Sequence, residues 1–155
     1  MKNIEPQKEA GNIESERVNP HSTFRPAKLE DIFFMLHNVA EHNMFKGAIF
    51  RVYPELKKLL SEVENENERK QIAKEFFSKV LDDNKEEILE STREFQKAWD
   101  KIESNVMHAL SEICERDWAE KDKLITVNVS INPISPRDIE KRSFDVYYRK
   151  NSKDM

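Results

Sequence analysis

Apolar side chains recur every three to four residues over most of the chain between residues 27 and 117, which is the spacing of amphipathic helices. Polar or turn-forming residues interrupt this spacing near Gly47, Glu64 and Asp83. The short apolar segment 48–53 is expected to be an extended connector or a last irregular turn. The pattern therefore predicts four helices, at about residues 27–45, 54–64, 67–81 and 84–117.

The fourth predicted helix carries the most regular pattern. Coiled coils prefer uniform Ile, Val or Leu along such a seam, whereas this one also contains Thr, Trp and Ala. A long helix packed inside a bundle is therefore the better interpretation. The seam positions alternate steps of four and three residues: Ile88, Thr92, Phe95, Trp99, Ile102, Val106, Ala109 and Ile113.

Hydrophobicity then changes to a period of two, which indicates strands with one buried face. The alternation predicts strands at about 124–131 and 143–149. In the connection between them, Ser135 is expected to cap a single helical turn that begins at Pro136. The predicted fold class is α+β, a bundle of about four helices followed by a two-stranded antiparallel sheet.

The first 23 residues are polar and lack either period, so we expect residues 1–23 to form a disordered tail. Residues 24–155 then make up the ordered domain. Two strands form a marginal sheet on their own, and an uncovered outer edge would invite pairing with another chain. For this reason the domain is expected to be incomplete at its C-terminal end.

Composition narrows the class of protein. The 155 residues include 26 basic and 30 acidic side chains, giving a net charge of −4. This balance provides no basic face for nucleic acid or for an anionic membrane. No segment approaches the twenty apolar residues of a membrane span, and the single Cys114 favours a reducing compartment. We expect a cytoplasmic protein that binds neither nucleic acid nor membrane.

No catalytic, cofactor-binding or metal-binding residue can be assigned from the sequence. His37 and His42 are five residues apart, whereas a helical zinc site requires four. They are better interpreted as surface histidines at a helix end, with Glu41 one turn from His37. His21 lies in the polar tail without an evident partner, and Cys114, six residues from His108, is expected to be a small core or boundary residue.

Trp99 and Trp118 are expected to anchor the core or its boundary, because each can bury a large apolar area. Tyr147 and Tyr148, followed by Arg149 and Lys150, are too small a group to indicate nucleic-acid binding.

The C-terminal part carries one resemblance. The segment Ile125–Arg137, with its Pro-Arg loop, and the segment Arg142–Tyr148 resemble the strand, loop and strand that precede the zinc helix in uncharacterised bacterial zincin-like proteins. In that group a helix with an H-E-x-x-H motif follows, in which two histidines bind zinc and the Glu activates water. This chain ends where that helix would begin, so no ligand or catalytic residue is carried over to it.

The resemblance implies that the second strand is an edge strand beside the active site, where an extended peptide or protein partner can pair with it. The residues of this predicted edge strand are Ser143, Phe144, Asp145, Val146, Tyr147 and Tyr148.

Two functions remain open at this point. In the first, the chain is the non-catalytic N-terminal portion of a zinc-dependent peptidase-like protein. Zinc and enzymatic activity are then expected only if the sequence continues past residue 155. In the second, the chain is a complete helical interaction or regulatory module without enzymatic activity. The oligomeric state is open in both.

Overall fold

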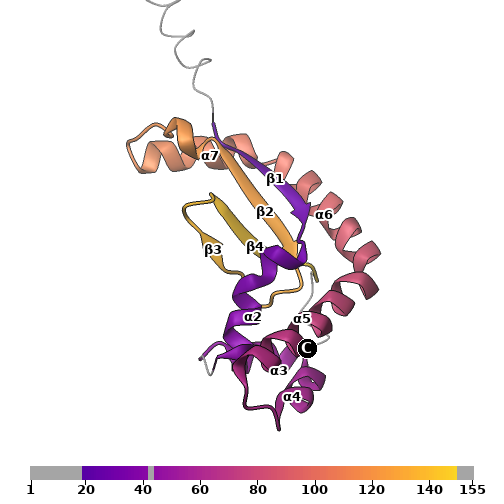
Figure 1. Cartoon of the computed structure of the whole chain (residues 1–155). Coiled ribbons are helices and arrows are strands. Elements are labelled where there is room, and N and C mark those ends of the chain that lie inside the picture. Colours follow the sequence, from indigo (N-terminus) through magenta and orange to yellow (C-terminus); the bar gives the residue numbers. More distant parts are fainter. Residues whose placement is uncertain (1–18, 42–43, 150–155) are drawn as a thin grey trace, which may run out of the picture.

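The computed structural model describes residues 19–41 and 44–149. These residues form six α-helices and a four-stranded mixed sheet (Figure 1). The predicted α+β class is confirmed, but the two-stranded antiparallel sheet is wrong. The strands lie in the order β1 (His21–Pro26), β2 (Leu124–Ser130), β4 (Ser143–Tyr147) and β3 (Arg137–Asp138).

β2 and β4 are parallel, although only a short connection joins them. The reason is that the connection contains β3, which pairs antiparallel with the outer side of β4. The chain passes from β2 to the far edge of the sheet and returns between the two strands. Ser135 does not cap a helical turn: it takes a positive φ of 53° just before β3 begins.

β1 includes residues 21–23, which were predicted to belong to the disordered tail. It pairs parallel with β2, placing Phe24 opposite Val127 and Arg25 opposite Asn128. Its outer edge is covered by side chains. Gln96 accepts from the Phe24 amide (2.8 Å) and donates to the Ser22 carbonyl (3.1 Å). The side-chain amide of Gln96 thus makes the two hydrogen bonds that the backbone of a neighbouring strand would make.

The first predicted helix is divided into shorter elements. These are a 3-10 turn η1 (Leu29–Ile32), α2 (Phe33–Ala40) and, after a turn, α3 (Lys46–Val52). The segment 48–53 is therefore largely helical rather than extended. Pro54 begins α4 (Pro54–Leu60), as its fixed φ favours, but this helix ends earlier than predicted.

The third predicted helix is confirmed as α5 (Glu66–Asp83). Asn65 caps its N-terminus by accepting from the Glu68 amide at 3.0 Å. Such a cap satisfies one of the amides that lack a partner in the first helical turn.

The fourth predicted helix is two helices, α6 (Lys85–Asp100) and α7 (Glu103–Ile113), followed after a loop by a 3-10 turn η2 (Glu120–Asp122). Its seam is buried only in the first half, at Ile88 and Thr92, whereas Ile113 is 78% exposed. α6 packs along β1, and α7 crosses the end of the sheet where β1 begins (Figure 1). The break between them turns the chain away from the core.

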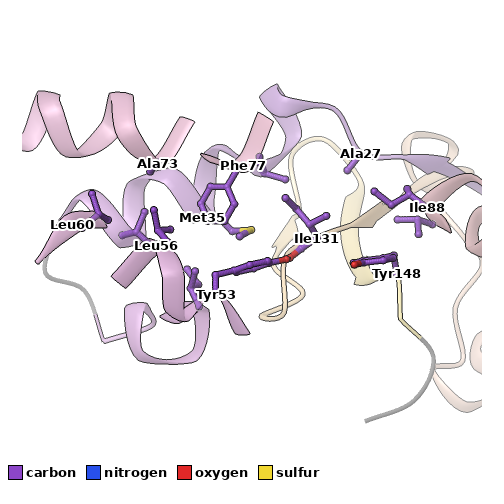
Figure 2. Packing of buried hydrophobic residues seen from close by; sticks show 14 residues of the cluster. Ala27, Met35, Tyr53, Leu56, Leu60, Ala73, Phe77, Ile88, Ile131 and Tyr148 are labelled. Carbon is purple, nitrogen blue, oxygen red and sulfur yellow. The ribbon is translucent and has the colours of Figure 1, made fainter. Parts of the chain in front are cut away.

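The main core joins the helices to the C-terminal ends of the parallel strands. Tyr53 lies at this junction: its ring contacts Phe77 edge to face, and its hydroxyl donates to the Ile131 carbonyl (Figure 2). Burial raises the pKa of Tyr53 well above its ordinary value, so the hydroxyl remains a donor. Tyr148 is also buried in this cluster.

Arg69 of α5 is buried among the helices. Its guanidinium donates to four backbone carbonyls at or just after the ends of two helices, at 2.8 to 3.2 Å. Helix C-terminal carbonyls lack partners within their own helix and carry partial negative charge. Arg69 therefore satisfies α2 and α4 together and fixes their positions. The four acceptors belong to Val39, Ala40, Leu60 and Val63.

Candidate ligand-binding cleft

The sheet presents two chemically different faces, because side chains alternate along each strand. Phe24 faces α6, where its ring meets Phe95 at a centroid distance of 6.4 Å. The strand register places Val127 on the same face. The opposite face is therefore lined by the polar residues of the alternation.

Three polar residues form a row across that face. Arg25 of β1 lies opposite Asn128 of β2, and Asn128 lies opposite Asp145 of β4. A second row, nearer the start of these strands, contains Thr23, Thr126 and Ser143. The row lies one residue before the end of β1 and at the middle of β4.

A cleft of about 690 Å³ lies over these polar residues. Its floor includes Asn128 and Asp145, and one wall is formed by η1 and the first turns of α2. Phe33 projects from this wall with 69% of its surface exposed. The opposite rim follows β3 and the turn after it, including Ile139.

Asn128 and Asp145 are directly bonded at the cleft floor. Asn128 Nδ2 donates to Asp145 Oδ1 at 3.0 Å, and the two residues are only 5% and 4% exposed. Within residues 19–41 and 44–149, Asn128 Oδ1 and Asp145 Oδ2 have no hydrogen-bond partner. Asn38 Oδ1 and Asn132 Nδ2 share this condition but do not line the cleft. Buried polar atoms in native proteins are nearly always paired, so the two cleft acceptors require a donor.

Burial raises the pKa of Asp145 above its ordinary value of 3.8. The Asn128 hydrogen bond opposes this rise, and the negative charge of Asp31 adds to it. The Ser130 side chain also lowers the pKa of Asp145, and its hydroxyl oxygen accepts from the Asn132 amide at 3.1 Å. A carboxyl with a shifted pKa in a cleft is a physical mark of a functional site.

Asp31 holds Arg25 at the wall of the cleft. Arg25 Nη2 donates to Asp31 Oδ1 at 2.7 Å, and the Lys28 amide donates to Asp31 Oδ2 at 2.7 Å. Both carboxylate oxygens are thus engaged. The guanidinium lies near Asp145 and lowers its pKa electrostatically, but Asp31 is its hydrogen-bond partner.

A second hollow of about 500 Å³ adjoins the cleft, between α2 and α5. The two hollows share Glu30, Phe33 and His37 as lining residues. Leu29 and Leu36 give the second hollow an apolar part, and Lys74 lies at its α5 side. Together they form two adjacent depressions separated by the exposed Phe33 ring.

The predicted edge strand occupies a different place from the one expected. β4 lies between β2 and β3, so it is not at the edge of the sheet. Ser143, Phe144 and Asp145 line the cleft, whereas Tyr148 is buried and bonds Asn84. That an extended peptide or protein partner pairs with this strand stays a prediction.

Other residues singled out in the sequence do not converge on this cleft, apart from His37. His37 pairs with Glu41 at 3.0 Å, in line with a surface histidine at a helix end, and His42 lies outside the described residues. His21 has a partner after all, Glu103, at 2.9 Å. Cys114 is exposed, so the prediction of a core or boundary residue is wrong.

The two tryptophans are half-buried, and each donates a hydrogen bond to a group of α7. Trp99 Nε1 donates to Glu103 at 2.8 Å, and Trp118 Nε1 donates to the Met107 carbonyl at 3.2 Å. Neither ring packs against the main core cluster of the described residues, so the expectation of core or boundary anchors stays a prediction. Among the residues that the structure describes, no three His, Cys, Asp or Glu side chains gather as a metal site would require.

Arg25, Asp31 and Asn128 were not predicted as site residues from the sequence. Asn128 and Asp145 were taken as the polar positions of two alternating strands, which ordinarily face water. The available signal was the number of polar residues on one sheet face next to a helix that begins with two exposed aromatics, Phe33 and Phe34. Only the parallel register of the strands shows that Asn128 and Asp145 are neighbours.

Comparison of the chain with protein-family models, with curated proteins and with solved structures finds no match. In the part of the chain that the structure describes, none of the helices combines the length and the apolar content needed to cross a membrane.

Proposed function

We propose that this chain is a binding module whose cleft takes an extended peptide segment of a partner protein. The observation that carries the proposal is the pair of unpartnered acceptors, Asn128 Oδ1 and Asp145 Oδ2, buried at the floor of a cleft. Leaving such a group without a bond costs about 1–3 kcal/mol. An unpaired buried polar group in a native structure calls for an explanation, and a ligand that donates to it is one.

The shape of the site favours a peptide over a compact small molecule. Small-molecule sites usually enclose most of their ligand, whereas here two hollows lie side by side and are partly open to solvent. Adjacent hollows separated by Phe33 suit successive side chains of one extended segment. The exposed apolar surface of Phe33 and Ile139 would be covered by such a ligand.

The proposal is compatible with both sequence-based hypotheses. A peptide-binding module can stand alone, or it can present a substrate segment to a catalytic part supplied by further sequence. The resemblance to zincin-like proteins assigns no zinc ligand to this chain, and it stays a prediction. The interaction-module hypothesis is the one that the cleft geometry supports directly.

The test is selection of binding peptides from a random phage-displayed library against the full chain, followed by calorimetry with synthetic peptides. We expect peptides with dissociation constants in the micromolar range, typical of short-motif recognition at about −8 kcal/mol. Phe33→Ser should weaken binding roughly tenfold, because the ring separates and lines both hollows.

Leu59→Ser is the matched control. Leu59 is also an exposed apolar side chain, but it belongs to α4 and lines neither hollow. The unfolding free energy of both variants should lie within about 0.5 kcal/mol of that of the parent protein. Failure of the library to yield any peptide, or equal effects of the two variants, would overturn the proposal.

A further inference from the structure

We infer that the Asn128–Asp145 floor is a specificity site for a basic side chain, and above all for the guanidinium of an arginine, in the bound peptide. The inference rests on the proposed function and names the residue type that the cleft selects. It follows from the kind of atoms that lack partners, from the charges that line the cleft, and from an internal arginine beside it.

Both unpartnered atoms are acceptors. The bond from Asn128 Nδ2 to Asp145 Oδ1 fixes which end of the amide points away, because a flipped amide would place two acceptor oxygens against each other. Asn128 Oδ1 and Asp145 Oδ2 therefore both seek donors. A guanidinium presents several N–H donors in a planar fork and can meet two acceptors together. An acidic or purely apolar side chain offers none.

The charged side chains that line the cleft also favour a basic side chain in the ligand. Carboxylates outnumber basic side chains in the lining by five to three. Charge-assisted hydrogen bonds to a carboxylate are stronger than neutral ones. The aromatic ring of Phe33 at the wall suits the aliphatic stem of a long basic side chain, and it can also contact its cationic head.

The chain already contains a guanidinium next to this floor. Arg25 lies in the same row of the sheet, next to Asn128, which in turn lies next to Asp145. It is held at the wall by Asp31 at 2.7 Å rather than at the floor. The positive charge of Arg25 acts electrostatically on Asp145 and therefore opposes the entry of another cation. Arg25 is therefore a positioning and selectivity residue, and its removal should favour a basic ligand.

The inference is tested with the peptides selected from the library. Each peptide that contains arginine is resynthesised with citrulline, which keeps the shape and removes the charge. We expect basic residues to be enriched at one position. We expect citrulline to weaken binding tenfold or more, the scale of a hydrogen bond to a charged group. The ¹⁵N resonance of the Asn128 side-chain amide should shift on binding.

Two variants of the full chain sharpen the test. Arg25→Gln should tighten binding of the arginine peptide roughly two- to fivefold, the range for a partly exposed charge pair, and should leave the citrulline peptide unaffected. Arg51→Gln is the control, because Arg51 is an exposed arginine of α3 that lines neither hollow. It should change neither affinity.

The outcomes separate this inference from the proposed function. If peptides bind but show no basic preference, or if citrulline binds equally well, the basic-residue inference fails while peptide binding stands. If a basic peptide binds without shifting Asn128, the assigned location is wrong. A structure of the complex in which only a water bridges Asn128 and Asp145 also overturns the inference. If no peptide binds, both proposals fall.

Discussion

Asn128 Nδ2 donates to Asp145 Oδ1 at 3.0 Å, and this bond joins two parallel strands at the floor of the cleft. The bond engages the amide nitrogen of Asn128 and one carboxylate oxygen of Asp145, whereas Asn128 Oδ1 and Asp145 Oδ2 find no donor among the described residues. The same pair thus ties the sheet together and leaves two acceptors in the cleft. Stability and binding place opposite demands on Asp145.

Asp145→Asn should therefore stabilise the free protein at neutral pH. Burial raises the pKa of Asp145 above its ordinary 3.8, which means that folding disfavours the ionised form. At pH values above the folded-state pKa this is a destabilising contribution. It declines as the pH falls through that pKa and is absent below 3.8, where the carboxyl is protonated in both states.

Urea unfolding at several pH values between 7 and 4 measures this effect. The stability advantage of Asp145→Asn should shrink as the pH falls. The same variant should bind the arginine peptide at least tenfold more weakly, because the charged acceptor is gone. Asp83→Asn, which alters an exposed carboxylate of α5 that lines neither hollow, is the control for the loss of one negative charge. A destabilised Asp145→Asn protein at pH 7 would contradict the argument.

Glu103→Gln should destabilise the protein at neutral pH by about 1–3 kcal/mol. Burial raises the pKa of Glu103, but hydrogen bonds from the Ser22 amide, His21 and Trp99 outweigh it, so the net pKa is lower than 4.5. A lowered pKa stabilises the folded state at pH values above the unfolded-state pKa. This contribution is lost as the pH falls through the folded-state pKa.

The comparison is made by denaturant unfolding at pH 7 and at pH 3. Wild type and Glu103→Gln should differ clearly at pH 7 and much less at pH 3. Glu112→Gln provides the control, because Glu112 also lies near a histidine in α7 but is exposed. An equal loss for both variants at pH 7 would show that the contacts of Glu103 with β1 do not stabilise the fold.

Arg69→Met should cost about 3 kcal/mol or more in unfolding free energy. The substitution keeps much of the apolar stem but removes the donors of four carbonyls, each costly to leave unpaired when buried. Arg69→Lys should lose less, because an ammonium retains up to three donors. Equilibrium unfolding monitored by circular dichroism provides the values.

Arg93→Met, at an exposed position of α6, is the control for the loss of a helical arginine. The Arg93 side chain is 75% exposed and lies 3.7 Å from Glu90, a surface pair that contributes little. Its replacement should change the unfolding free energy by no more than about 0.5 kcal/mol. If Arg69→Met were equally mild, the guanidinium would not be what holds α2 and α4 in place.

The local periodicities predicted much of the secondary structure and little of the topology. The apolar spacing located α5 closely, and the alternation located β2 and β4. The seam of the fourth predicted helix could not reveal the break before Glu103, because apolar spacing continues through Ile102 and Val106 while the helix axis does not.

The missing topology depends on contacts between residues far apart in sequence. β1 has only Phe24 as a large apolar residue, and its edge is completed by Gln96 and Glu103 from helices some seventy to eighty residues later. No local pattern carries that information. The cleft depends on the same parallel register, so Asn128 and Asp145 were recognised as polar strand positions but not as neighbours.

Gln96→Ala should expose the edge of β1. The substitution removes the acceptor of the Phe24 amide and the donor of the Ser22 carbonyl. We expect a loss of about 1–2 kcal/mol and faster hydrogen exchange at the Phe24 amide than at the Val127 amide of the neighbouring strand. An open strand edge also templates pairing with another chain, so light scattering should show concentration-dependent association of the variant.

Gln71→Ala separates the role of this edge from the loss of any helical glutamine. Gln71 Nε2 donates to Glu75 at 2.7 Å on the exposed side of α5, a contact within one helix that touches no strand. This control should remain monodisperse to the same degree as the parent protein and should not change exchange at Phe24. Equal exchange rates at Phe24 in the parent and Gln96→Ala proteins would mean that the side-chain amide does not take the place of a neighbouring strand.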